Sequence, residues 1–443
     1  MARVLLVCRY PLGEPLPTYL HNMDSLLNAS GHQVYCANMA RTRLPRYLAS
    51  LEPDLVIFHY TFLSVRTVPE EFDELASRIA FLKDLECRKA AVVLEEQMRS
   101  DILSAFMRDF GVTHVFTPAP PDEWPRIYDG VDFNAVTFKR VLTGYVDEAT
   151  ARALARRADR LDRPIDIGYR SWYSQPFYGS HGQLKGRIGD LFKQRACEVG
   201  LVVDISRRRE DAFIGNRWFE FLLRCKYTVG VEGGSSVFDR DGRIAMRTLE
   251  YLRTHDDPPF EEVRAACFPH EDGEFKYYLP SPRHLEAVMT KTCQVLVEGE
   301  YGGALKPGLH YIELKRDFSN IGEVLELIRS DARRATIVER AYRDVVLSGD
   351  FSYSVFAETV IGTSLDGVIP RERSMLASLA SIRLMANHLG EHIWRAALPV
   401  HRRIPRSAEI RSRFRRSLRP LASSIVGEDK LRGLLARMRR GQS

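Results

Sequence analysis

The sequence SPRHLEAVMTKTCQVLVEGEYGGALKPGLHYIEL, residues 281–314, shows three patterns one after another. Residues 282–292 have helical spacing, the apolar run 294–297 suits a short buried strand, and the glycines Gly302 and Gly303 mark a turn. This order is typical of an α/β unit. Ligands bind at the carboxyl edge of the strands in open parallel sheets, and polar side chains gather around this strand. The segment therefore predicts a ligand site.

The composition indicates more than one hydrophobic core. The 443 residues exceed the roughly 100 to 200 of an ordinary domain, so we expect two domains with additions. Hydrophobic and charged contents of 45% and 28% are typical of soluble globular proteins, and no apolar run approaches the ~18 residues of a membrane span. The N-terminal run MARVLLVC is too short for a signal peptide, which predicts a cytoplasmic protein.

Residues 1–145 alternate between apolar runs and helical patterns. Five runs have the length and composition of buried strands: Arg3–Cys8, His32–Cys36, Leu55–His59, Ala90–Leu94 and His114–Thr117. Helical patterns lie between them. We therefore predict a parallel sheet covered on both faces, which is a Rossmann-like domain.

A second alternating series follows a charged helical linker at residues 146–164. Its strand candidates are Ile165–Tyr169, Leu201–Asp204, Thr228–Val231 and Gln294–Val297. They predict a second Rossmann-like domain over residues 165–348. A closing helix is expected within residues 349–370.

Residues 371–443 form a basic tail. They hold 17 Lys and Arg against 5 Asp and Glu, a net charge of +12, whereas the other residues sum to −6. Apolar residues recur every three or four positions from Leu376 to Ala397, as on an amphipathic helix. A helical extension packed on the body and a segment lying on an anionic membrane surface both stay open. The aromatic residues of a stacking platform are missing, so we expect no nucleic-acid partner.

Several motifs of the second half resemble group 1 glycosyltransferases, especially their CgeB-like, spore-maturation-type branch. The matching stretches are IGYR at 167–170, Tyr178-Gly179 with Lys185, PRHLEA at 282–287, and GLHYIEL with DFSN between 308 and 320. The resemblance covers about residues 165–350 and extends to the first half only in architecture. It implies the GT-B fold, in which two Rossmann-like domains face a cleft, and transfer of a sugar from a nucleotide diphosphate sugar held by the second domain.

Two groups of residues suit the phosphates and the sugar of such a donor. Arg170 and Lys185 fall at the end of a strand and before a helix, where positive side chains favour a diphosphate. A solvated loop arginine and an exposed helical lysine are the simpler alternative. The segment VEGGSS adds Gly233, Gly234 and Ser235, whose backbone N–H groups can face an anion or a sugar.

The resemblance assigns the ribose hydroxyls to Glu286, and Arg283 and His284 stand beside it. A carboxylate accepts two hydroxyl hydrogen bonds readily. The position eight residues earlier is Tyr278, where the family usually has another glutamate. The alternative for Glu286 is an ion pair with Arg283 on the helix surface, at a spacing of three residues.

The turn after the strand is expected to form a wall of the donor site. Glu300 and Tyr301 with Gly302 and Gly303 would face the donor sugar, because glycine lets the backbone approach closely and a carboxylate binds hydroxyls. His310 is included in this wall, although a structural histidine is the commoner reading.

The residues Asp239-Arg240-Asp241 spell the DxD sequence of metal-dependent glycosyltransferases. The arginine between the carboxylates offsets their attraction for a cation, and Asp-Arg-Asp-Gly is a common turn. Seven cysteines without a CxxC pair also argue against a zinc site. We therefore expect no metal and no cofactor, with the nucleotide sugar as substrate.

Catalytic groups are expected from the first half. Glu95 and Glu96 directly follow the strand ending at Leu94, and His21 opens the first helix. An inverting reaction needs such a base to deprotonate the acceptor hydroxyl, whereas a retaining reaction does not.

Together these features predict a metal-independent glycosyltransferase that acts on a glycan or lipid-linked acceptor in cell-surface polysaccharide synthesis. Its basic tail would bring it to the inner face of the cell membrane. A nucleotide-sugar epimerase of GT-B architecture and a non-catalytic, membrane-associated assembly protein are the alternatives.

Overall fold

The computed structural model describes residues 1–9, 17–40, 44, 48, 50–213, 215–370, 374 and 377–381. Residues Met1–Ile382 form one compact unit. Nearly all of the predicted basic tail, residues 371–443, lies outside the described residues, so its amphipathic pattern stays a prediction. None of the described helices combines the length and the apolar composition that a membrane span requires.

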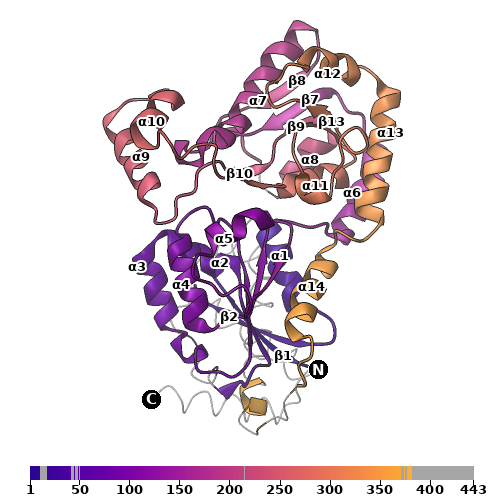
Figure 1. The fold of residues 1–443 in the computed structure, drawn as a ribbon. Coiled ribbons are helices and arrows are strands. Elements are labelled where there is room, and N and C mark those ends of the chain that lie inside the picture. The colour runs from indigo at the N-terminus through magenta and orange to yellow at the C-terminus, as the bar shows by residue number, and fades with distance from the viewer. Residues whose placement is uncertain are drawn as a thin grey trace, which may run out of the picture. The chain divides into compact units, whose positions relative to one another are not determined.

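The first sheet has six parallel strands in the order β2-β1-β3-β4-β5-β6 (Figure 1). The strands are β1 (Arg3–Cys8), β2 (Gln33–Asn38), β3 (Leu55–Phe58), β4 (Arg88–Val92), β5 (His114–Thr117) and β6 (Thr137–Arg140). All six residues of β1 are buried, as expected of a parallel strand that is covered on both faces. The predicted parallel α/β fold of the first half is confirmed.

The edge strand β6, TFKR, does not follow from the sequence pattern. Its side chains are exposed or half-buried, so it has no apolar run to mark it. The helices of this half are α1 (Pro17–Leu27), α2 (Tyr60–Leu63), α3 (Pro69–Ser77), α4 (Ser100–Phe110) and α5 (Trp124–Ile127).

The helix α14 (Tyr353–Leu365) returns the chain to the first sheet. Its residues Phe356 and Val360 share one core with Val4 and Leu6 of β1. Figure 1 shows this orange helix beside the indigo strands, although the two segments stand about 350 residues apart in the sequence. The last described long helix therefore belongs to the core of the first half.

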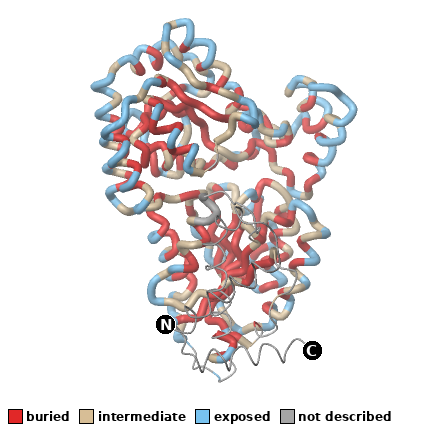
Figure 2. The backbone as a smooth tube through the Cα atoms, turned by 180° about the vertical axis from the view of Figure 1, so that it is seen from behind, coloured by how far each residue is buried: buried red, intermediate tan, exposed pale blue. Residues whose placement is uncertain are grey.

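The second sheet has five parallel strands in the order β13-β12-β9-β7-β8. The strands are β7 (Ile165–Arg170), β8 (Val203–Ser206), β9 (Cys225–Gly230), β12 (Cys293–Val297) and β13 (Ile312–Leu314). Buried residues follow the strands of both sheets, as the red segments of Figure 2 show. The second Rossmann-like fold is confirmed.

Helices pack on both faces of the second sheet. One core joins the strands to α7 (Gly179–Glu198), α12 (Ile321–Ile328) and α13 (Asp331–Ala341). The other face is covered by α6 (Glu148–Ala158), α8 (Asn216–Leu223) and α11 (Pro282–Met289). The predicted linker helix is α6, and it packs as part of this second layer.

An excursion leaves the second sheet after β9. It contains the antiparallel pair β10 (Gly233–Ser235) and β11 (Tyr277–Leu279), with α9 (Arg243–Thr254) and α10 (Phe260–Cys267) between them. Gly234 has φ +102°, and a Cβ atom built on it would lie 1.8 Å from the carbonyl oxygen of Tyr277. Only glycine fits there, because both the backbone conformation and the contact exclude a side chain.

We expect Gly234→Ala to lower the free energy of unfolding by about 3 kcal/mol, because alanine would strain the backbone and push β10 away from β11. Denaturant unfolding measures this change. Gly233→Ala is the matched control, since a Cβ there meets Lys185 Nζ at 3.6 Å and the Leu279 carbonyl at 3.8 Å, both ordinary contacts. Equal stability of the two variants would contradict the prediction.

Candidate functional site

A cavity of about 620 Å³ lies at the carboxyl ends of β7 and β9. Residues of α7, α8 and α11 and of the β9–β10 loop line it, and Leu94, Glu95, Gln97 and Thr143 join them from the first half. Its volume is in the range of pockets for small molecules of nucleotide size. Ligands are expected at this edge of a parallel sheet, so the cavity is the candidate site.

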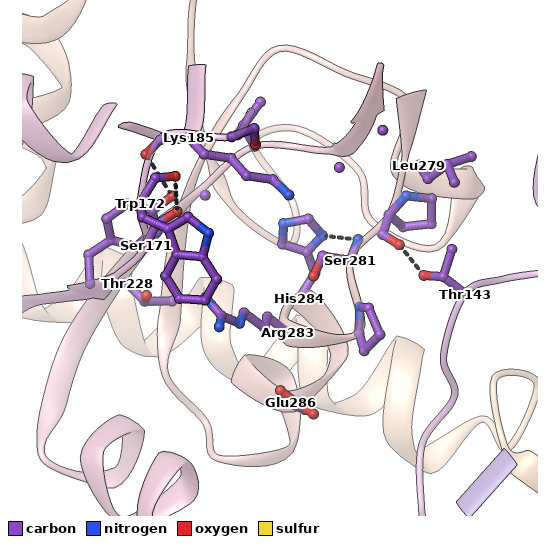
Figure 3. A pocket seen from close by; sticks show the side chains of 18 of the residues that line it. Thr143, Ser171, Trp172, Lys185, Thr228, Leu279, Ser281, Arg283, His284 and Glu286 are labelled. Carbon is purple, nitrogen blue, oxygen red and sulfur yellow. Dashed lines mark hydrogen bonds between the residues drawn. The ribbon is translucent and has the colours of Figure 1, made fainter. Parts of the chain in front are cut away.

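Three positive side chains line the cavity without a carboxylate partner among the described residues, and one of them, Arg209, lies 5.7 Å from the centre of the Trp172 ring. Lys185 enters from α7 and Arg283 from α11, as Figure 3 shows. The guanidinium of Arg283 donates to the Arg170 carbonyl at 2.6 Å and lies 4.9 Å from the centre of the Trp218 ring. Burial, followed by repulsion from Arg283, lowers the pKa of Lys185 to about 8. The cavity therefore holds unpaired positive charge.

His284 lies next to these cations as a neutral ring. Burial, followed by the charges of Lys185 and Arg283, lowers its pKa to about 3. Nδ1 accepts the backbone N–H of Ser281 at 3.1 Å, which leaves the proton on Nε2. The Tyr301 ring packs edge-on behind it, with centroids 4.9 Å apart. The backbone of Val231 accepts the remaining ring N–H, so both ring nitrogens of His284 have protein partners.

Glu286 also lines the cavity. Its Oε2 accepts the indole N–H of Trp218 at 2.8 Å, and its other oxygen has no partner among the described residues. Burial raises its pKa, while Arg283 and the Trp218 bond act in the opposite direction. The structure shows no ion pair between Glu286 and Arg283, although both lie on α11. The free oxygen is thus available to a ligand.

The glycine segment is divided by the structure. Gly233 and Gly234 line the cavity. Ser235 is fully buried, and its hydroxyl lies 2.7 Å from the Val237 carbonyl and 3.2 Å from the Tyr178 carbonyl. Its side chain therefore stabilises the loop.

Asp239 of the DxD sequence caps a helix. Its carboxylate accepts the N–H groups of Ile244 and Ala245 at 3.0 and 2.8 Å, at the start of α9. Asp241 pairs with Arg243. Within the described part of the chain, no three His, Cys, Asp or Glu side chains gather as metal ligands do.

Arg170 does not line the cavity. Its guanidinium binds the Asp204 carboxylate at 2.6 Å and lies 4.4 Å from the centre of the Phe221 ring. It also donates to the carbonyls of Tyr169, Asp204 and Asp211. These bonds tie β7 to β8 and leave the side chain committed to protein acceptors. Only its carbonyl serves the site, where it holds Arg283.

The predicted wall after β12 turns away from the cavity. Glu232 is buried, and its carboxylate accepts the Tyr301 N–H at 2.7 Å, which draws Tyr301 into the core. Glu300 is 77% exposed and lies 3.6 Å from Arg140. The glycines Gly302 and Gly303 follow in the same turn and are likewise absent from the cavity lining.

His310 has internal partners on both ring nitrogens. Its Nδ1 accepts the Lys306 N–H at 3.2 Å, and Nε2 lies 3.2 Å from the Asp344 carboxylate. The ring is 5% exposed and does not line the cavity. This is the structural arrangement that the sequence left open as the alternative.

The three predicted catalytic residues occupy different environments. Glu96 is fully buried, and its carboxylate accepts the hydroxyls of Thr117 at 2.5 Å, Tyr128 at 3.1 Å and Tyr277. Glu95 is exposed at the cavity and has φ +61°, a strained conformation for a side-chain residue. His21 packs edge-on against Tyr353 and does not line the cavity.

Several cavity residues carry no sequence signal. Trp218 falls in a helix with an ordinary apolar pattern, and Tyr277 in a short strand that the pattern does not predict. Thr228 and Gln294 each carry one sequence signal, because each is the polar first residue of a predicted strand that is otherwise apolar. A polar residue in a buried strand needs a partner, and that requirement could have identified both.

Comparison with protein-family models and with curated proteins gives no match for this sequence. Among solved structures, the chain is similar to Anabaena HepE in complex with UDP-glucose, at 11% identity and a TM-score of 0.44, over 83% of this chain and 100% of that chain. Sucrose-phosphate synthase from Thermosynechococcus elongatus shows 11% identity and a TM-score of 0.48, over 83% and 99%. T4 phage BGT in complex with UDP-glucose shows 9% and 0.46, over 83% and 100%.

We expect Lys185→Met to raise the free energy of unfolding of the ligand-free protein at pH 7, because the folded state then no longer holds a buried charge. The pKa of a lysine in the unfolded chain is about 10.4. In the folded protein the pKa of Lys185 is lowered to about 8. The wild type therefore pays the full free-energy penalty of holding Lys185 charged below pH 8, and this penalty decreases as the pH rises toward 10.

Denaturant unfolding of wild type and variant between pH 7 and 10 measures the difference. Lys193→Met, at an exposed position of the same helix, is the control. Its difference in free energy of unfolding from the wild type should not decrease with pH. A gap that stays constant across this pH range would contradict the prediction.

Proposed function

We propose that this protein is a glycosyltransferase that binds a nucleoside diphosphate sugar in the cavity and transfers the sugar to an acceptor bound beside Glu95. The observation that carries the proposal is the pair Lys185 and Arg283, two cations without carboxylate partners at the strand edge of a Rossmann-like domain. A diphosphate supplies the negative charge that this pair lacks. The CgeB-like branch of the family remains part of the proposal.

The diphosphate would lie between Lys185 and Arg283. Negative charge grows on the diphosphate as its bond to the sugar breaks, and fixed positive groups in a desolvated cavity stabilise that charge. The two side chains thereby fill the role that a divalent cation has in metal-dependent transferases. Gly233 adds backbone that a phosphate or sugar can approach closely.

Glu286 would hold the ribose. Its free carboxylate oxygen accepts hydroxyl protons, and Trp218 fixes the other oxygen in place. Such bonds compensate the burial that raises the pKa of Glu286 in the free protein.

Glu95 is the proposed general base of an inverting transfer. It and Glu286 are the two carboxylates that line the cavity in the described part of the chain, and Glu286 already binds Trp218. The acceptor oxygen would form a bond to the anomeric carbon while the bond from that carbon to the diphosphate breaks. The leaving diphosphate takes the electron pair of the broken bond. The acceptor proton then moves to Glu95.

The kind of acceptor and the place where the protein acts are proposed from the basic tail. A segment of net charge +12 is attracted to an anionic surface, at about 1 kcal/mol for each Lys or Arg near it. This supports an acceptor that is glycan or lipid-linked, and polysaccharide assembly at the inner face of the cell membrane.

Removal of either cation should weaken donor binding. We expect Arg283→Ala and Lys185→Ala each to raise the Kd for a nucleotide sugar by roughly 10- to 100-fold, since each loses a charge-assisted contact to phosphate. Calorimetry with UDP-, GDP- and dTDP-linked sugars measures the Kd. Arg187→Ala is the matched control, because Arg187 is exposed on α7 and lies over Phe318.

Unchanged donor affinity in both cation variants would refute the proposed site. Incubation of the protein with donor alone provides a second check. Epimerised sugar in that mixture would favour an epimerase, whereas slow hydrolysis or no reaction agrees with a transferase that waits for its acceptor.

Substitution of the proposed base should separate chemistry from binding. We expect Glu95→Gln to lower kcat by about 100-fold or more, with the donor Kd unchanged, because the amide cannot accept the acceptor proton. Transfer rates with the donor that binds best provide the measurement. If kcat stays near the wild-type value, Glu95 is not the base.

A further inference from the structure

Two buried polar side chains on neighbouring strands line the cavity. Thr228 on β9 and Gln294 on β12 are register partners, 6% and 1% exposed. Gln294 Oε1 is buried without a hydrogen-bond partner, and neither the rest of its amide nor the Thr228 hydroxyl has a side-chain partner among the described residues. Unsatisfied buried groups cost stability, so their presence calls for an explanation.

The surroundings of this pair suit an aromatic ring. Phe213 and the α8 residues Trp218 and Phe219 line the same cavity. Aromatic side chains pack well against a planar ring, while the amide and hydroxyl offer both donors and acceptors to its edge. A nucleobase combines these two properties.

The orientation of the donor follows from the proposed function, on which this inference rests. The sugar must point toward Glu95 and the acceptor, and the diphosphate lies between Lys185 and Arg283. The nucleoside then extends the other way, past the ribose-binding Glu286. Thr228 and Gln294 are the polar lining residues of β9 and β12 to which the proposed phosphate and ribose contacts give no role.

We infer that Gln294 and Thr228 read the hydrogen-bonding edge of the donor's nucleobase and thereby select the nucleotide. The amide presents one acceptor and two N–H donors, and the hydroxyl presents one donor and one acceptor. A base whose edge matches these groups satisfies them all. A mismatched base leaves buried groups unpaired, which is the more effective source of discrimination.

Calorimetry on the full chain with UDP, GDP, CDP and ADP tests this inference, with inorganic diphosphate as the probe that lacks a base. The wild type should bind its best nucleoside diphosphate roughly tenfold or more tightly than its worst. In Gln294→Met and Thr228→Val, this ratio should fall toward one. The affinity for inorganic diphosphate should not change, because Lys185 and Arg283 remain.

The outcomes separate this inference from the proposed function. If neither diphosphate nor any nucleoside diphosphate binds, the proposed function fails. If nucleoside diphosphates bind and the ratio between bases is the same in both variants as in the wild type, the inference fails and the proposed function stands. Equal binding of all four bases by the wild type also overturns the inference.

Stability of the ligand-free protein distinguishes a binding role from a structural one. Gln294→Met should keep or raise the Tm, because it removes a buried oxygen that has no partner, and Thr228→Val should leave the Tm near the wild-type value, because the Thr228 hydroxyl has no side-chain partner among the described residues. Thr290→Val is the matched control: the Thr290 hydroxyl donates to the carbonyls of Glu286 and Ala287, so its loss should lower the Tm. A fall in Thr228→Val as large as in Thr290→Val would overturn the inference.

Discussion

The site depends on positive charge that the protein itself leaves unneutralised. Lys185 and Arg283 repel one another, and each lowers the cost of bringing an anion into the cavity. Arg283 is held by the Arg170 carbonyl and by the Trp218 ring, both of which fix its position without cancelling its charge. A carboxylate in either place would form an ion pair and cancel the positive charge on which the proposed diphosphate site depends. The strands and helices therefore fix the positions of Lys185 and Arg283, and the lack of a carboxylate partner leaves their positive charge in the cavity.

A buried polar cluster connects the first half to the rim of this cavity. Glu96 binds Tyr277 of β11 and Tyr128 of the first half, and the buried guanidinium of Arg66 donates to the carbonyls of Leu94 and Glu95. A buried carboxylate is tolerated only when such partners compensate it. The same bonds fix the backbone on both sides of Glu95, which keeps its positive φ. Glu96 thus positions the residue next to it, and Glu95 is left free for the cavity.

The sequence predicts the fold well because buried parallel strands are apolar runs. Such runs can be recognised in the local sequence without knowledge of which distant residues they contact. Among the predicted site residues that line the cavity are Lys185, predicted from its place before a helix, and Glu286, which the resemblance assigned. Arg170 has the same local signal, but its position relative to Asp204 depends on the pairing of β7 with β8. The positions of the Glu300 and His310 side chains depend likewise on contacts with residues that are distant in the sequence. Local pattern therefore locates the edge of the sheet, and long-range contacts decide which side chains reach the cavity.

The distribution of charge in the cavity supports transfer chemistry in addition to binding. A base near the two cations would be paired with them and would lose its affinity for a proton. For Glu286, the charge of Arg283 and the bond from Trp218 both lower the pKa that burial raises, whereas Glu95 follows a strand of the other sheet. The neutral ring of His284 lies beside the cations without weakening them. The cavity therefore carries its positive side chains on the second half of the chain and one exposed carboxylate, Glu95, on the first half.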